Sequence, residues 1–232
     1  MTDPETRVDI RNSSDAIDER LSPVWGLISS SSGIIWDFDG VVADTEPVQG
    51  DAYRQLLLAR GKSPSRAFFN PYVGRTEPEI WEGLAHDFAL EESLDALKEE
   101  RAAVYLENAK SRLIPAWFVI PVLSRADARG LPNVIVSSGN HSAISALLDS
   151  WGLERQFSDV LALGSPSSAG LPSKNNRVKH AVARYGPVPL VIEDNAAYLA
   201  EARALGALTL GIRHSLNDLN TSDADVVLPI HL

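Results

Sequence analysis

The chain of 232 residues contains no cysteine. Disulfides, thiolate zinc sites and thiol nucleophiles are therefore excluded. Lysine and arginine are also scarce: there are 21 of them against 31 aspartates and glutamates, which gives a formal net charge of −10. Because nucleic-acid binding depends on clustered lysine and arginine, we expect no nucleic-acid partner.

Long hydrophobic runs are missing as well. No segment approaches the roughly 20 apolar residues that a bilayer-spanning helix needs, so we expect no membrane partner. Residues 1–20 are polar and acidic and lack the apolar centre of a secretory signal. With the absence of cysteine, these features favour a cytoplasmic protein.

What the chain does contain is an alternation of short apolar segments and segments with helical periodicity. Strands are expected at 34–36, 133–137, 159–163, 188–193 and 207–212. Helices are expected at 51–60, 78–88, 91–109, 142–150, 176–185 and 196–205. Such alternation predicts an α/β fold with a Rossmann-like parallel sheet that helices cover on both faces.

The segment between the first and second strands is almost entirely helical, which predicts an inserted helical cap. We divide the chain into an N-terminal extension at 1–30, a catalytic core at 31–45 and 113–232, and a cap at 46–112. The beginning of the extension, to about residue 18, is expected to pack loosely.

The most informative motif lies where the first strand ends. Asp37 and Asp39 follow the apolar run 34–36, and Gly40 comes next. Far downstream, Glu193 and Asp194 end another apolar strand. Open α/β sheets place ligands at the carboxyl ends of their strands, and carboxylate oxygens suit a hard cation there. We therefore expect the four acids to form a magnesium site.

A phosphate-binding position follows the second expected strand. Ser137 ends that strand, and the next residues open a helix whose free backbone amides attract anions. Ser138 is expected to contribute mainly its backbone amide.

The motif Asp37-Phe38-Asp39-Gly40-Val41 closely resembles the first motif of the haloacid dehalogenase superfamily. Ser137 and the pair Glu193-Asp194 match later motifs of that family in the expected order. The segment 72–80 is similar to the cap substrate loop of its β-phosphoglucomutase and phosphoglycolate phosphatase branch. The resemblance covers about residues 34–212.

This resemblance implies a phosphoryl-transfer site. Asp37 would be the nucleophile, and Asp39 the general acid and base, with its backbone carbonyl on Mg²⁺. Asp37, Glu193 and Asp194 would supply the other metal oxygens. Gly74 and Arg75 of the cap loop would bind an anionic group of the substrate.

The family's lysine motif departs from its usual form in this chain. Leu171 occupies the position where the nearest relatives carry lysine. We assign the lysine role to Lys174, which precedes a helix, and keep Lys179 as the fallback. Of the five histidines, none has metal-ligand spacing, and only His141 is expected near the site.

The resemblance leaves more than one activity open. The leading interpretation is a Mg²⁺-dependent phosphatase that acts on a small phosphorylated metabolite, such as a sugar phosphate. One alternative is a sugar phosphomutase of the same fold, although Gln49 stands where those mutases carry histidine. The others are a phosphorylatable receiver-type module and an inactive phosphate-binding module.

Overall fold

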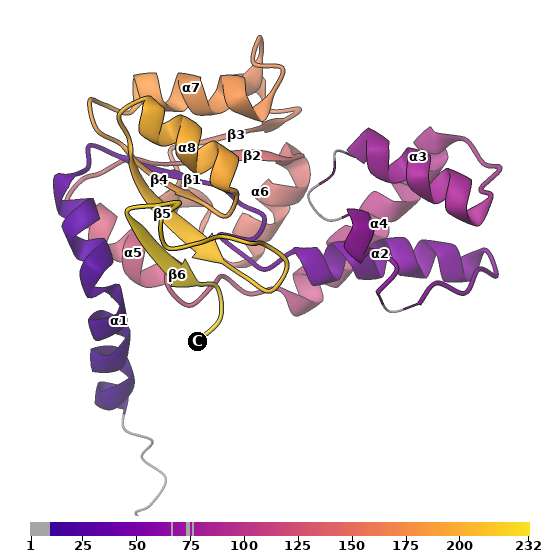
Figure 1. The fold of residues 1–232 in the computed structure, drawn as a ribbon, viewed down its shortest axis with the longest axis horizontal. Helices are drawn as coiled ribbons and strands as arrows, with labels where there is room; N and C mark the ends of the chain where they lie inside the picture. Colours follow the sequence, from indigo (N-terminus) through magenta and orange to yellow (C-terminus); the bar gives the residue numbers. More distant parts are fainter. Residues whose placement is uncertain (1–9, 66, 73–74, 76) are drawn as a thin grey trace, which may run out of the picture.

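A six-stranded sheet forms the centre of the structure, a computed structural model that describes residues 10–65, 67–72, 75 and 77–232 (Figure 1). The strands are β1 Ile34–Trp36, β2 Asn133–Asn140, β3 Asp159–Leu163, β4 Leu190–Glu193, β5 Leu208–Arg213 and β6 Val226–Pro229. All neighbouring strands pair in parallel, in the order β3-β2-β1-β4-β5-β6. The predicted parallel α/β fold is confirmed.

The helices are α1 Ile10–Ser30, α2 Glu46–Ala59, α3 Glu77–Phe88, α4 Leu94–Arg112, α5 Val119–Asp127, α6 His141–Ser150, α7 Lys174–Arg184 and α8 Ala196–Ala204. Short 3-10 turns lie at η1 Asn70–Tyr72, η2 Glu154–Gln156 and η3 Pro166–Ser168. Within the described residues, no helix is long and apolar enough to cross a membrane.

Side chains of β1 alternate between the two faces of the sheet, as strand geometry requires. Ile34 and Trp36 join the larger apolar cluster, with residues of α1, α5 and α6. Ile35 points the other way and packs with residues of α7 and α8. Both faces of this central strand are therefore dry, which explains its unbroken apolar sequence.

Helices α2, α3 and α4 stand together beside the sheet (Figure 1). They share a separate apolar cluster around the buried side chains of Tyr53, Trp81 and Leu84. Ala52 of α2 and Tyr105 of α4 belong to the main cluster instead. The cap helices thus have their own core and also pack on the sheet layer at their base.

The N-terminal extension contains a helix that the sequence did not predict, and its second half, beyond the segment expected to pack loosely, is buried. Residues 10–30 form α1, which lies on the opposite side of the sheet from the cap helices (Figure 1). Leu21, Val24 and Ile28 of this helix are fully buried in the main cluster. Their i, i+3, i+7 spacing is helical, but Pro23 within the helix obscures the pattern.

Besides α1 and the short 3-10 turns, α5 and β6 were not predicted. Helix α5 begins four residues after Pro115 and carries Pro121 in its first turn, where proline is tolerated. Strand β6 follows an acidic segment and pairs only with β5, at the edge of the sheet.

We predict that Ile28→Ala lowers the free energy of unfolding by about 2–5 kcal/mol, because it removes a fully buried side chain from the main core. Urea denaturation should measure the loss. Leu58→Ala, at a side chain of α2 that is 43% exposed, should cost much less. Equal losses for the two variants would show that α1 is not part of the core.

Candidate active site

Three chain segments meet at the carboxyl edge of the sheet. Trp36, the last residue of β1, is in register with Ile135 of β2 on one side and Ile192 of β4 on the other. The backbone N–H of Asp37 donates to the carbonyl of Ile192 at 2.9 Å. Because β1 ends between its two neighbours, Asp37 lies beside the ends of both strands, at the point where the strand order reverses.

Lys174 links the first and last acidic motifs. Its Nζ lies 2.8 Å from Oδ2 of Asp37 and 2.8 Å from Oε2 of Glu193. All three side chains are buried. Lys174 is the first residue of α7, and Ser173 caps that helix by accepting the N–H of Asn176. The helix start therefore aims the lysine at the sheet edge.

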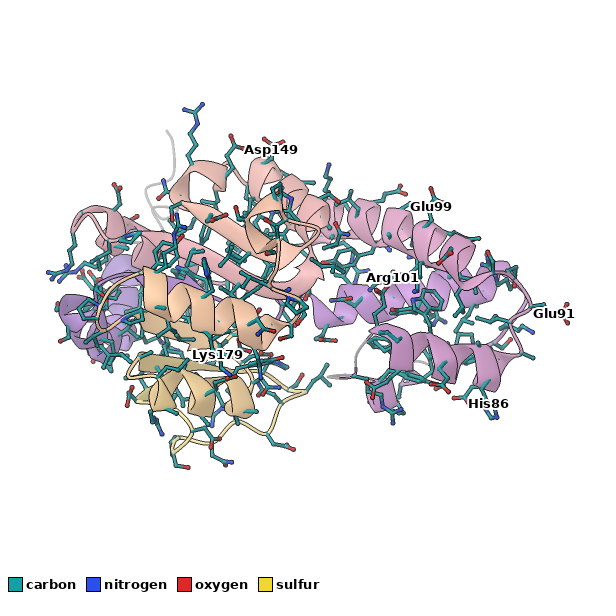
Figure 2. The ribbon with its side chains drawn as sticks, turned by 90° about the horizontal axis from the view of Figure 1, so that it is seen from above. His86, Glu91, Glu99, Arg101, Asp149 and Lys179 are labelled. Carbon is teal, nitrogen blue, oxygen red and sulfur yellow. The ribbon has the colours of Figure 1, made fainter. Side chains whose placement is uncertain are left out.

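Lys179, the fallback, has a different environment. Its Nζ pairs with Glu201 at 3.0 Å, and its side chain is 56% exposed. Figure 2 shows it on the outer side of the core. Of the two candidates, only Lys174 contacts Asp37.

Burial dominates the electrostatics of this cluster. It raises the pKa of Asp37 well above its usual value, and the charge of Glu193 adds to the rise while Lys174 opposes it. It also raises the pKa of Glu193 to about 7. Burial lowers the pKa of Lys174, but Asp37 and Glu193 outweigh that effect and keep it above its usual value. The lysine is therefore a fixed positive charge.

The acids fit a divalent cation. One oxygen each from Asp37, Glu193 and Asp194 lies within 4.8 Å of the others. These are carboxylate donors only, which suits Mg²⁺. Lys174 contacts only two of these carboxylates, Asp37 and Glu193, and a divalent cation would bring further positive charge to the cluster.

The carboxylate of Asp39 is held by three side chains. Thr45 donates to its Oδ1 at 2.6 Å, Gln49 donates to the same oxygen at 3.2 Å, and Ser137 donates to Oδ2 at 3.3 Å. Thr45 and Gln49 belong to the start of α2, so Asp39 is tied both to the cap and to the core.

Ser137 is fully buried in β2, three residues before that strand ends at Asn140. Its Oγ also accepts the N–H of Gly139 at 2.8 Å, whereas Ser138 is exposed. The guanidinium of Arg177 donates to the carbonyl of Ser137 at 3.2 Å and to that of Leu171 at 3.0 Å. This buried arginine joins β2 to the loop before α7.

The cap-loop residues are placed less fully. Gly74 lies outside the described residues. Arg75 is exposed, and its guanidinium carbon lies 5.7 Å from the centre of the Tyr72 ring. Among the described residues, no hydrogen bond or ion pair joins Arg75 to the core acids, so its substrate role stays a prediction.

Sequence reasoning missed the role of Arg101 of α4. Its guanidinium donates to Gln49 and stacks on the rings of Tyr53, at 4.5 Å, and Tyr105, at 5.0 Å. Figure 2 shows it within the cap. No spacing in the sequence links residue 101 to the first motif, because only packing of α4 on α2 brings them together.

The expectation that only His141 lies near the site is wrong. His214, in the loop after β5, places its Nε2 2.8 Å from Oδ2 of Asp194. Burial lowers the pKa of His214, but the hydrogen bond with Asp194 and the charges of Asp194, Asp44 and Glu46 together outweigh burial and raise the pKa above its usual value. A loop residue with no motif around it gave no signal in the sequence.

Comparison with known proteins identifies relatives. The model of a hydrolase family, described as haloacid dehalogenase-like hydrolase, matches residues 32–206. A protein of Thermotoga maritima named "Phosphorylated carbohydrates phosphatase" is 28% identical over 193 residues, which covers 80% of this chain and 87% of the relative.

Solved structures show the same fold at lower identity. A Thermotoga maritima protein with a provisional beta-phosphoglucomutase name has a TM-score of 0.71 at 21% identity, covering 85% of this chain and 94% of the other. A HAD family hydrolase from Deinococcus radiodurans R1, with bound phosphate and sodium, has a TM-score of 0.63 at 19% identity, covering 86% and 91%. These similarities support the fold.

We predict that, without divalent cations, the stability of the protein falls as pH rises from about 5 to 7.5. Glu46, close to Asp39 and Asp194, has a pKa raised to about 7, chiefly by burial, as has Glu193. Since both values exceed the unfolded value of 4.5, the folded state binds more protons in this window, and raising the pH removes that stabilisation.

Urea unfolding in EDTA at several pH values checks this prediction. Glu46→Gln should flatten the pH dependence, whereas Glu154→Gln, at an exposed residue, should leave it unchanged. An unchanged slope in Glu46→Gln would contradict the assignment.

Proposed function

Since the chain belongs to the haloacid dehalogenase-like hydrolase family, we propose that it is a phosphatase that hydrolyses a small phosphorylated metabolite through an aspartyl-phosphate on Asp37. The observation that carries this proposal is the buried contact of Lys174 with both Asp37 and Glu193 at the carboxyl edge of the sheet. The name of the Thermotoga maritima relative supports a sugar phosphate or a similar molecule as the substrate class.

The first step forms the covalent intermediate. A carboxylate oxygen of Asp37 attacks phosphorus, and the bond from phosphorus to the ester oxygen breaks. Asp39 gives its proton to the leaving oxygen, which departs as an alcohol. Asp39 suits this role because it lies two residues from the nucleophile and is oriented by Thr45, Gln49 and Ser137.

The second step releases phosphate. Asp39 accepts a proton from water as that water attacks phosphorus, and the bond to Asp37 breaks. Lys174 stays charged throughout and stabilises negative charge that develops on the transferring group, as does the hydroxyl of Ser137. Mg²⁺, held by Asp37, Glu193, Asp194 and the backbone carbonyl of Asp39, would neutralise further phosphate charge.

The other activities have less support. Gln49 hydrogen-bonds Asp39 in the position that the mutases give to histidine. An amide does not titrate at neutral pH, so it cannot relay a proton. Family membership sets the receiver-type module aside. The intact acid cluster argues against an inactive phosphate-binding protein.

We predict that the protein releases phosphate from at least one member of a panel of phosphorylated metabolites when Mg²⁺ is present. EDTA should abolish release, and Asp37→Asn should abolish it while leaving the fold intact by circular dichroism. Phosphate release by a clean Asp37→Asn preparation, or in chelator, would overturn the mechanism. Interconversion of sugar phosphate isomers without phosphate release would indicate a mutase.

Lys174→Ala should lower kcat by about 10²-fold or more, because it removes a preorganised charge from the transferring group. It should also destabilise the fold, since Asp37 and Glu193 would lose their buried counter-charge. Lys179→Ala, the matched control on the same helix, should keep near-normal kcat. If steady-state kinetics instead gave the larger loss of kcat in Lys179→Ala, Lys179 and not Lys174 would be the catalytic lysine.

A further inference from the structure

His214 has a defined hydrogen-bonding role in this structure. Its side chain is 5% exposed. Its Nδ1 accepts the backbone N–H of Leu216 at 3.2 Å, so in this arrangement the ring hydrogen sits on Nε2. That nitrogen lies 2.8 Å from Oδ2 of Asp194 and donates to it.

The loop that carries His214 is itself fastened to Asp194. Asn217 accepts the backbone N–H of His214 at 3.1 Å. The amide nitrogen of Asn217 donates to the backbone carbonyls of Asp194, at 2.9 Å, and Ile212, at 3.0 Å. The loop after β5 therefore hydrogen-bonds Asp194 twice: Asn217 contacts its backbone carbonyl, and His214 contacts its carboxylate.

The backbone of Gly40, in the first motif, lies against both Asp194 and His214. Its φ of +73° favours glycine, and a Cβ there would lie 2.5 Å from Oδ2 of Asp194 and 3.2 Å from Nε2 of His214. The Asp194–His214 pair thus sits directly against the main chain that follows Asp39.

We propose that His214 is a positioning residue for the cation site: it occupies Oδ2 of Asp194 and fixes the carboxylate so that its other oxygen is directed to the metal. This inference rests on the magnesium site of the proposed function. Carboxylate ligands are commonly oriented by such hydrogen bonds, and loss of the partner typically costs 10–100-fold in metal affinity.

A second histidine–aspartate pair serves as a built-in comparison. Nε2 of His231 lies 2.7 Å from Oδ2 of Asp44, nearly the same distance as in the proposed pair. The His231 side chain, however, is 73% exposed, and Asp44 is not among the acids that could hold a cation. Removal of this pair should not change cation binding.

The test is titration of the substrate-free protein with Mg²⁺ by isothermal titration calorimetry. His214→Asn keeps an acceptor for Leu216 but is too short to reach Asp194, so it should raise the Mg²⁺ dissociation constant 10–100-fold. His214→Gln can extend an amide donor toward Asp194 and should recover part of the affinity. His231→Asn should match the wild type.

Further measurements distinguish a specific loss of cation binding from a general folding defect. Urea unfolding in EDTA reports stability without the cation, and Asn217→Ala, which loosens the loop without touching the carboxylate, should also weaken Mg²⁺ binding. In kinetics, His214→Asn should require more Mg²⁺ for half-maximal rate, yet approach wild-type kcat when Mg²⁺ is saturating.

Each outcome decides a separate point. Unchanged Mg²⁺ affinity in His214→Asn, beside clear binding by the wild type and its loss in Asp194→Ala, would overturn the role of His214 alone. A wild type that binds no Mg²⁺ would overturn both this inference and the proposed metal site. Equal losses in His214→Asn and His214→Gln would show that the donor to Asp194 is not what matters.

Discussion

The buried contact among Lys174, Asp37 and Glu193 is the constraint on which the site depends. Each carboxylate oxygen lies 2.8 Å from the ammonium, and the three side chains are at most 8% exposed. Charges taken out of water are costly unless they are paired at short range. The parallel register of β1 with β4 and the start of α7 must therefore be correct before the cluster is stable.

The same cluster keeps an excess of negative charge at the sheet edge. Glu193 and Glu46 both have pKa values near 7 because burial and neighbouring acids disfavour their ionisation. Such a site gains most from a cation that removes the repulsion. Asp194 is the most exposed of the three acids that could hold a cation, and His214, from another element, hydrogen-bonds its carboxylate.

The cap helices contact the candidate site through Asp39. Thr45 and Gln49 at the start of α2 hold Asp39, and Arg101 of α4 holds Gln49 while stacked on Tyr53 and Tyr105. The orientation of Asp39 is thus coupled to the packing of the cap helices. A hydrolase that must admit substrate and then exclude water requires such a connection between the two parts.

The sequence by itself determined the alternation of elements and the strand ends at Asp37 and Glu193, whereas β2 continues past Ser137 to Asn140. These are local features: apolar runs and turn residues specify them within a few positions. It also identified Lys174 by its place before a helix, although whether Lys174 or Lys179 faced the acids depended on how α7 docks. The structure places Lys174 on Asp37 and pairs Lys179 with Glu201.

Only the tertiary structure decided the contacts of Arg101, Arg177 and His214. Each reaches the site across a large sequence separation, from a helix face or loop without a motif, so no spacing could reveal it. The burial of α1 was hidden for a related reason, because its apolar residues become a core face only when the sheet is present. Local pattern predicts those elements whose apolar runs are clear, whereas side-chain partners depend on packing between elements.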